Sequence, residues 1–216
     1  MQAADKAALR RAIRSRFPGD EIRRAESGAM CRHILSWEPY RQAETVGAYI
    51  PLRREADVTA VMLDVLASGR TLALPRVDGE GSMTLRRVRS LEELVPGAYG
   101  IPEPGGDTEI IPLSAVSLLI VPMEGIDHRG IRLGKGGGYY DRLLEGSPVM
   151  TLGAVMSWQW EEELPAMPGK AALEQALLDV PGVRPAEADY EAGLILVTGT
   201  AEKEPLLQAI AEAADA

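Results

Sequence analysis

A glycine-rich segment in the second half of the 216-residue chain carries its clearest chemical signal. Four of the five residues 134–138 are glycines, between a predicted buried strand and a predicted helix. Glycines there let backbone N–H groups converge on an anion, and a helix N-terminus adds partial positive charge. The side chains of Arg132 and Lys135 could donate to phosphate oxygens. The segment therefore predicts a phosphate-binding loop.

Two common nucleotide-binding motifs do not fit this loop. Lys135 is not followed by Ser or Thr in the frame of a Walker A motif, and the preceding strand ends too early for a dinucleotide fingerprint. The residues after the glycines add further chemistry, because Tyr139 and Tyr140 could stack on a ring. The carboxylate of Asp141 could hold Mg²⁺ beside a phosphate. A flexible surface loop is the alternative interpretation.

The elements that must position the loop alternate between strands and helices. Asp20 and Asp57 are suitable N-caps, Gly69 can end a helix, and residues 96–112 are rich enough in Pro and Gly to indicate a loop. The pattern predicts one α/β domain over residues 1–216, with a largely parallel or mixed sheet and helices on both faces. The expected strands are 45–50, 71–75, 82–88, 116–122, 149–156 and 192–199, and the expected helices are 4–17, 20–36, 57–69, 136–145 and 201–213.

Composition restricts the partners. A net charge of −9 argues against general nucleic-acid binding. The N-terminus has no signal-peptide core, and no apolar run is long enough to cross a bilayer. A single cysteine, Cys31, fits a buried apolar position in a reducing, cytoplasmic setting. Lys6 and Arg10 are one helical turn apart and could close over phosphates, although a solvated helix face is the alternative.

Residues 132–141 match a known signature in full. The run RLGKGGGYYD resembles the Arg-Leu-Gly-x-Gly-x-Gly-Tyr-Tyr-Asp motif of the 5-formyltetrahydrofolate cyclo-ligase family, also called methenyltetrahydrofolate synthetase. Other segments are similar to that family in order and spacing: KAALR (6–10), EAD (55–57), LPRV (74–77), GIPEP (100–104), VPMEGID (121–127), GAVMSWQ (153–159) and LP (164–165).

The resemblance implies a fold, cofactors and a reaction. The fold is a three-layer α/β domain with a mixed sheet, related to the sugar-phosphate isomerase and CoA-transferase superfamily. The cofactors are ATP and Mg²⁺, and the substrate is a reduced folate, 5-formyltetrahydrofolate, with or without a polyglutamate tail. ATP phosphorylates the formyl oxygen, N10 attacks the activated carbon, and loss of phosphate gives 5,10-methenyltetrahydrofolate. Such chemistry needs cations and positioning rather than a protein nucleophile.

The resemblance also assigns site residues. Arg132 and Lys135 are the expected catalytic cations, and Asp141 is the expected metal ligand. The expected ATP-binding residues are Lys6, Arg10, Arg132, Leu133, Gly134, Lys135, Gly136, Gly137, Gly138, Tyr139 and Tyr140. The expected substrate-binding residues are Ile50, Glu55, Tyr99, Lys135 and Tyr139, with the Glu55 carboxylate facing pterin N–H groups.

One position departs from the family pattern. Gly169 and Lys170 stand where the family usually has His-Asp, whose Asp helps to bind the metal. A lysine cannot ligate Mg²⁺, although it could contact phosphate. Two alternatives to an active cyclo-ligase therefore stay open: a catalytically impaired folate- or nucleotide-binding homologue, and a ligase acting on another substrate.

Overall fold

The computed structural model describes residues 3–79, 81–164, 183–189 and 194–199, together with Pro205 and Gln208. The chain divides into two compact units. The larger unit comprises Arg10–Ile126 and Arg132–Glu161, and the smaller unit comprises Met1–Leu9, Asp127–Ile131 and Glu162–Ala216. No helix among the described residues is long and apolar enough to cross a membrane.

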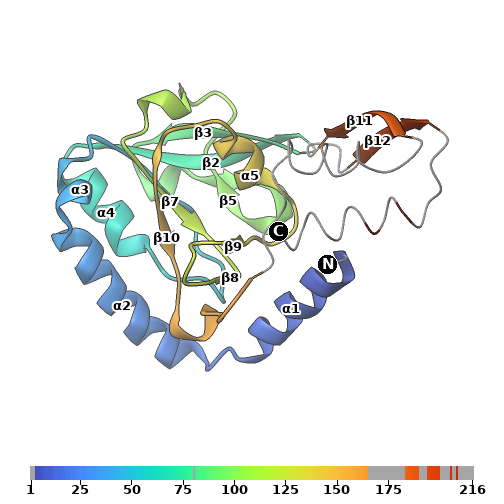
Figure 1. The fold of residues 1–216 in the computed structure, drawn as a ribbon. Coiled ribbons are helices and arrows are strands. Elements are labelled where there is room, and N and C mark those ends of the chain that lie inside the picture. The colour runs from blue at the N-terminus through green and yellow to red at the C-terminus, as the bar shows by residue number, and fades with distance from the viewer. Residues whose placement is uncertain are drawn as a thin grey trace. The chain divides into compact units, whose positions relative to one another are not determined.

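The larger unit is built on a six-stranded sheet with the order β10-β7-β1-β2-β3-β6. Four of these strands, β10, β7, β2 and β3, are labelled in Figure 1. The pairs β10–β7, β7–β1 and β1–β2 are parallel, whereas β2–β3 and β3–β6 are antiparallel. This confirms the prediction of an α/β fold with a mixed, largely parallel sheet. The strands are β1 (Thr45–Gly47), β2 (Thr71–Gly79), β3 (Ser82–Val88), β6 (Ile110–Ile111), β7 (Leu118–Pro122) and β10 (Met150–Ala154).

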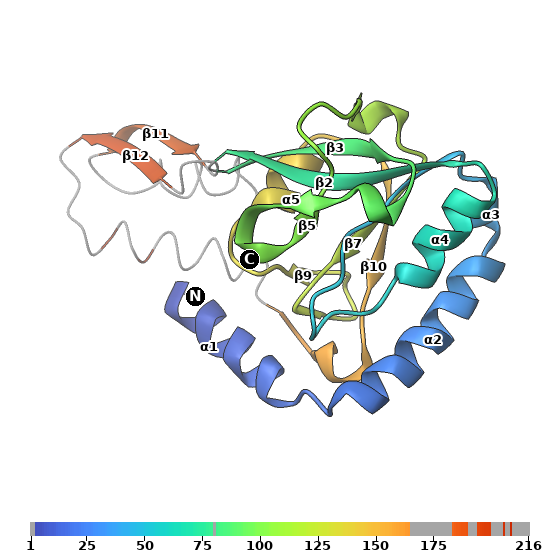
Figure 2. The same ribbon diagram turned by 180° about the vertical axis from the view of Figure 1, so that it is seen from behind.

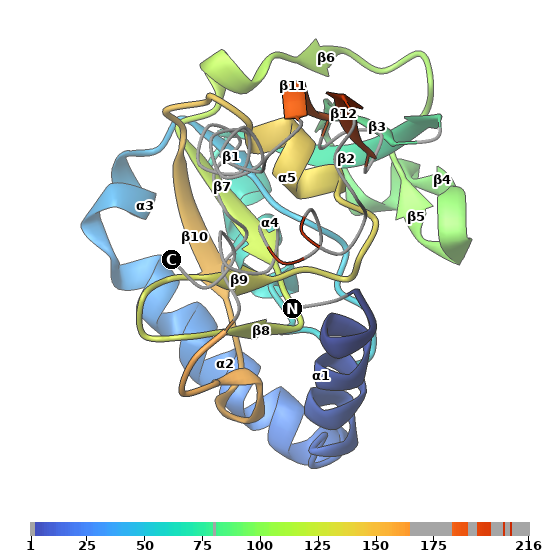
Figure 3. The ribbon, with the colours of Figure 1, turned by 45° about the vertical axis from the view of Figure 1, so that its right-hand side comes forward.

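Helices flank both faces of this sheet. Helices α2 (Asp20–Ser36) and α4 (Thr59–Ala67) lie side by side (Figure 2), and the short α3 (Glu38–Gln42) follows α2. Helix α5 (Tyr139–Leu144) lies on the other side of β7 and β10 from α2 and α3 (Figure 3). Helix α1 (Ala3–Ser15) begins in the smaller unit and ends in the larger one.

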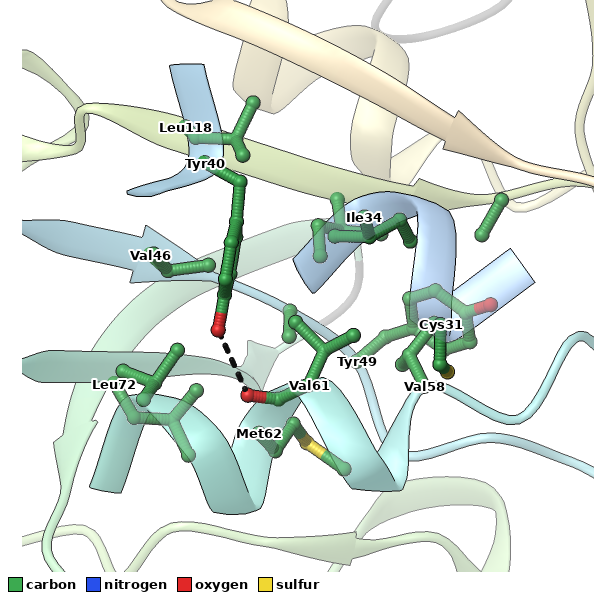
Figure 4. Close-up of a cluster of buried hydrophobic side chains, with 14 of the residues drawn as sticks. Cys31, Ile34, Tyr40, Val46, Tyr49, Val58, Val61, Met62, Leu72 and Leu118 are labelled. Atoms are coloured by element: carbon green, nitrogen blue, oxygen red, sulfur yellow. Dashed lines mark hydrogen bonds between the residues drawn. The ribbon is translucent and has the colours of Figure 1, made fainter. Parts of the chain in front are cut away.

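The alternation of strand residues divides the core into two clusters. Leu72 and Leu118 face α2–α4, and the Tyr40 ring packs among them and Val46 (Figure 4). The single Tyr40 hydroxyl proton is directed mainly to Asp64 Oδ2 at 2.6 Å, with the Val61 carbonyl as a longer alternative at 3.4 Å, and the hydroxyl oxygen accepts from the Arg70 guanidinium at 2.8 Å. A buried phenol therefore keeps its polar atom satisfied.

The opposite face of the sheet carries the second cluster. Ala73, Leu119 and Val121 are buried there, against Tyr140 and Leu143 of α5. Because neighbouring strand residues point to opposite faces, a continuous apolar run such as that of β7 is covered on both sides. The sequence pattern predicted this for residues 116–122.

Several element boundaries differ from expectation. The N-cap of α2 is Gly19, so Asp20 belongs to the first helical turn. Helix α4 begins at Thr59, whose N–H donates to Asp57 Oδ1 at 3.1 Å. Gly69 ends α4 as expected, with φ +73°. Cys31 is buried, as predicted, and its Sγ donates to the Asp57 carbonyl at 3.2 Å, while burial raises the pKa of the thiol.

The segment 96–112 was predicted as a loop, and the structure corrects this in part. Two short strands, β4 (Val95–Pro96) and β5 (Pro102–Glu103), pair antiparallel and form a hairpin. The strand β6 follows at the end of the segment. Single-turn 3-10 helices occur at η1 (Leu91–Glu93), η2 (Ala98–Gly100), η3 (Leu113–Ala115) and η4 (Ser157–Gln159).

The smaller unit contains the late strand that the sequence predicted. This strand, β12 (Leu194–Gly199), pairs antiparallel with β11 (Val183–Asp189) in a separate two-stranded sheet, rather than adding to the parallel sheet. The predicted terminal helix 201–213 and Lys170 lie outside the described residues, except for Pro205 and Gln208.

Candidate active site

A cavity of about 420 Å³ lies at the carboxyl ends of the parallel strands. Tyr49 and Ile50 follow β1, Pro122 ends β7, and Pro75 and Val77 come from the part of β2 beyond its pairing with β1. Ligands of open α/β sheets bind outside these strand ends. The other lining residues are Leu52, Glu55, Met83, Tyr99, Ile101, Pro102, Glu103, Arg132, Gly134, Lys135, Gly137, Gly138, Tyr139, Tyr140 and Asp141.

The glycine loop forms one wall of this cavity. Gly136 and Gly138 have φ of +106° and +66°, a left-handed region that disfavours other residues. None of the N–H groups of residues 134–138 donates a hydrogen bond to another described residue. The loop therefore presents a row of unused backbone donors, which is the arrangement that binds anions.

Two arginines hold the loop in place. Arg10 Nε donates to the Gly134 carbonyl at 2.7 Å. Arg142 donates from its guanidinium to the Gly137 carbonyl at 2.6 Å and from Nε to the Gly81 carbonyl at 2.7 Å. Two carbonyls of the loop, those of Gly134 and Gly137, thus accept hydrogen bonds from arginines. Sequence reasoning missed Arg142, although it directly follows the recognised motif.

The positive charge at the loop comes from side chains more than from the helix. Helix α5 was expected over 136–145 but spans only Tyr139–Leu144, so few peptide dipoles align behind the loop. Arg132 forms an ion pair with Asp141, whose side chain is 71% exposed. No cluster of three or more His, Cys, Asp or Glu occurs in the described part of the chain. Asp141 could offer one carboxylate to Mg²⁺, an ion that commonly takes few protein ligands and keeps several waters.

A buried carboxylate meets the loop at Lys135. Glu55 Oε2 accepts a hydrogen bond from Leu52 N at 2.8 Å. Glu55 Oε1 lies 2.5 Å from Lys135 Nζ and forms an ion pair with it. This buried oxygen accepts no hydrogen bond of good geometry from the described residues. Oε1 therefore retains capacity for a donor from a ligand.

The Tyr140 hydroxyl is the second buried polar atom without a hydrogen-bond partner among the described residues. Burial raises the pKa of Tyr140, and the nearby charge of Glu55 raises it further. The hydroxyl therefore stays protonated and can donate. Buried polar atoms are rarely left without a hydrogen bond in native proteins, so Tyr140 Oη indicates a binding site close to the Glu55–Lys135 ion pair.

The mouth of the cavity is spanned by two tyrosines. The hydroxyls of Tyr99 and Tyr139 lie 2.8 Å apart, and their rings meet edge to face with centroids 6.3 Å apart. Tyr99 has φ 58° and ψ 18°, which is uncommon for a residue other than glycine. The β4–β5 hairpin thus presents an exposed aromatic ring at the site.

The structure brings most of the expected site residues together around this cavity. Four do not line it, Lys6 among them. Leu133 is buried and pairs with Gly125 in the short hairpin of β8 (Gly125–Ile126) and β9 (Arg132–Leu133), Gly136 is exposed on the loop, and Arg10 braces the loop from α1. Lys6 lies one turn before Arg10 on α1, in the smaller unit. Sequence reasoning missed Tyr49 and Glu103, which also line the cavity.

In the smaller unit, Asp127 organises the chain around it. Its Oδ1 accepts from the N–H groups of Arg129 and Ile131 at 2.9 and 3.0 Å, and its Oδ2 accepts from Leu164 N at 2.9 Å and Arg129 Nε at 3.0 Å. Burial alone would raise the pKa of this carboxyl, but these hydrogen bonds outweigh burial and hold the pKa well below its usual range.

The fold and the cavity define an α/β protein in which a cationic glycine loop meets a buried carboxylate. A model of the 5-formyltetrahydrofolate cyclo-ligase family matches residues 2–178. The NMR structure of Aquifex aeolicus 5,10-methenyltetrahydrofolate synthetase is similar, with a TM-score of 0.67 and 34% identity over 74% of this chain and 82% of that one. The chain belongs to the 5-formyltetrahydrofolate cyclo-ligase family.

Further relatives agree on the family at lower identity. The 5-formyltetrahydrofolate cyclo-ligase of Escherichia coli K12 is 30% identical over 115 residues, which cover 52% of this chain and 63% of that protein. The enzyme of that name from Haemophilus influenzae is 27% identical over 161 residues, covering 72% and 86% of the two chains. The 5,10-methenyltetrahydrofolate synthetase of Mycoplasma pneumoniae has a TM-score of 0.59 at 18% identity, which supports the fold alone.

Proposed function

We propose that the chain is an ATP- and Mg²⁺-dependent 5-formyltetrahydrofolate cyclo-ligase. The formyl oxygen of the substrate takes the γ-phosphoryl group of ATP, leaving ADP. N10 then attacks the activated carbon and gives up its proton, and phosphate departs with the former formyl oxygen as 5,10-methenyltetrahydrofolate is formed. We further propose a single three-layer domain related to the sugar-phosphate isomerase and CoA-transferase superfamily.

One observation carries this proposal: the glycine loop and the buried Glu55 carboxylate share one cavity and are joined by the Lys135 ion pair. A reaction between a nucleotide phosphate and a folate needs a phosphate-binding group and a ring-binding group in the same cavity. The loop N–H groups suit phosphate oxygens, whereas Glu55 Oε1 suits ring N–H donors. Lys135 lies where the two would meet.

The protein groups act through charge and position. Arg132 and Lys135 would neutralise the phosphoryl group in flight, since such transfers depend mainly on electrostatic stabilisation and alignment. Ile50, Tyr99 and Tyr139 would flank the ring. Arg10 would fix the loop through the Gly134 carbonyl, and Lys6 is proposed as a further phosphate contact. Asp141 would hold Mg²⁺, which, when bound, would supply neutralising charge for the phosphates.

The alternative is a binding protein with impaired turnover, which Lys170 favours because it removes a carboxylate from the family's metal site. An absorbance assay for methenyltetrahydrofolate, with and without ATP and Mg²⁺, separates the two. Formation of the product only when both are present supports the cyclo-ligase. Binding of 5-formyltetrahydrofolate without turnover at any Mg²⁺ concentration would support the alternative.

A further inference from the structure

A second buried carboxylate lines the same cavity and has no assigned role. Glu103 ends β5, is only 5% exposed and lines the cavity wall. Its one hydrogen bond to a described residue is a long one, from Val77 N to Oε2 at 3.4 Å. Across the described ranges, no cation lies within ion-pair distance of it. Glu103 Oε1 has no hydrogen bond to a described residue and is not among the fully buried polar atoms, so solvent, or a ligand donor in its place, can reach it from the cavity.

The position of Glu103 is built into the hairpin. Glu103 pairs with Val95 in the β4–β5 ladder, and the Glu103 side chain lies over the backbone of Gly97. A Cβ atom on Gly97 would stand 2.4 Å from both Cγ and Cδ of Glu103. The hairpin therefore accommodates this carboxylate only because residue 97 has no side chain.

The surroundings define what Glu103 can receive. Val77, Met83, Ile101 and Pro102 make this part of the cavity apolar, and an uncompensated carboxylate there repels anions. The fitting group is a flat, neutral ring that brings N–H donors. An adenine ring carries one amino group, whereas a reduced pteridine carries N–H donors on more than one edge.

We infer that Glu103 is a specificity-determining residue of this cavity, which accepts hydrogen bonds from N–H groups of the pteridine ring of a reduced folate. Glu55 and Glu103 then each receive a different set of ring donors, and the second carboxylate selects a pteridine over an adenine. The inference rests on the proposed substrate class, and it gives a role to a residue of the GIPEP segment (100–104), outside the glycine-loop motif.

The variant Glu103→Gln keeps the shape of the side chain and replaces one acceptor oxygen with a donor NH2 group. If the amide oxygen keeps the bond to Val77 N, the amide nitrogen faces the cavity, where a ligand N–H would meet a donor. The matched control is Glu92→Gln, the same change at an exposed glutamate outside the cavity lining.

The test is titration calorimetry of the full chain with 5-formyltetrahydrofolate and, separately, with ADP. We expect Glu103→Gln to weaken folate binding roughly 10- to 100-fold, as for the loss of a hydrogen bond to a charged group, and ADP binding less than about twofold. Gly97→Ala, which displaces the carboxylate, should also weaken folate binding selectively, and Glu92→Gln should change neither affinity.

Two outcomes overturn the inference. Unchanged folate affinity in folded Glu103→Gln and Gly97→Ala would leave Glu103 without a ligand. Equal losses for folate and ADP would mean that Glu103 only supports the hairpin. Failure of the wild-type chain to bind 5-formyltetrahydrofolate would instead refute the proposed function, and this inference with it.

Discussion

Lys135 Nζ lies 2.5 Å from Glu55 Oε1, so a residue of the glycine loop neutralises the carboxylate at the base of the cavity. The side chain of Glu55 is 7% exposed and that of Lys135 is 37% exposed. The Lys135 ammonium can therefore turn towards solvent or a ligand, whereas the Glu55 carboxylate stays buried in the cavity. A phosphate that draws Lys135 away would free Glu55 Oε1 for a ring N–H.

Lys135→Met should destabilise the folded protein. The buried Glu55 carboxylate would lose its cation, and we expect a loss of about 1–2 kcal/mol in the free energy of unfolding, less than for a fully buried pair. Urea denaturation measures it. The double variant Lys135→Met with Glu55→Gln should recover stability but not turnover, and additive stability losses would contradict the coupling.

Gly138 and Gly146 form a natural matched pair, with φ of +66° and +64°. Alanine at either should cost about 1 kcal/mol of stability, because both positions are left-handed. Only at Gly138 would the new Cβ crowd Arg142, at 2.6 Å from its guanidinium, while Gly146 has open space. We expect Gly138→Ala to weaken ATP binding at least tenfold and Gly146→Ala to leave it unchanged; equal affinities would argue against the phosphate loop.

Tyr140→Phe should stabilise the ligand-free protein and weaken folate binding. The hydroxyl is buried without a partner among the described residues, so its removal relieves a desolvation cost of about 1 kcal/mol. Tyr49→Phe is the control, because that hydroxyl donates to the Ala56 carbonyl at 2.8 Å and its loss should destabilise by a similar amount. Thermal unfolding gives the signs, and a destabilised Tyr140→Phe would contradict the expectation.

Asp141→Asn should lose most of the activity, because the proposed Mg²⁺ site would lose its protein carboxylate. Asp141 is the carboxylate nearest the loop by sequence and pairs with Arg132, so the variant also frees that arginine. Lys170→Asp should lower the Mg²⁺ concentration for half-maximal rate. Rates are compared across a magnesium titration, and full wild-type activity in excess chelator would remove the metal role.

Asp127 should make stability fall in acid. Its pKa is held below the usual range, so its contribution is complete above about pH 4, the ordinary pKa of aspartate, and is lost as the pH falls through the lower folded-state value. The midpoint of thermal unfolding should therefore drop below about pH 4 in the wild type and less steeply in Asp127→Asn. The exposed Asp107→Asn is the control, and parallel profiles for all three proteins would contradict the prediction.

Local sequence signals predicted the parts of the fold that depend on neighbouring residues. The apolar run of β7 and the glycine at Gly69 were recognised because burial on two faces and a left-handed helix end leave direct marks in the sequence. The order of the strands was not predictable, because pairing of β10 with β7 joins residues that share no local pattern. The two-residue strands β4, β5 and β6 are too short to show periodicity.

The site divides in the same way. Glycines, cations and tyrosines of the loop stand together in the sequence, and so they were found. Glu103 and Arg142 were missed because their roles depend on contacts that no sequence pattern marks. Glu103 contacts the distant Val77 and the nearby Gly97, and Arg142 contacts the distant Gly81. A carboxylate on a hairpin is ordinarily a solvated charge, and only its burial distinguishes this one.

The bond from Arg142 to the Gly81 carbonyl has a consequence for mutational scanning. Gly81, in the turn between β2 and β3, does not line the cavity, yet it has φ +77° and a Cβ there would already lie in contact with the Arg142 guanidinium, at 3.4 Å. A bulky residue at this turn would push on Arg142 and, through it, on the Gly137 carbonyl. Loss-of-function variants should therefore appear at a surface turn that no ligand touches, and they would be misread as folding defects.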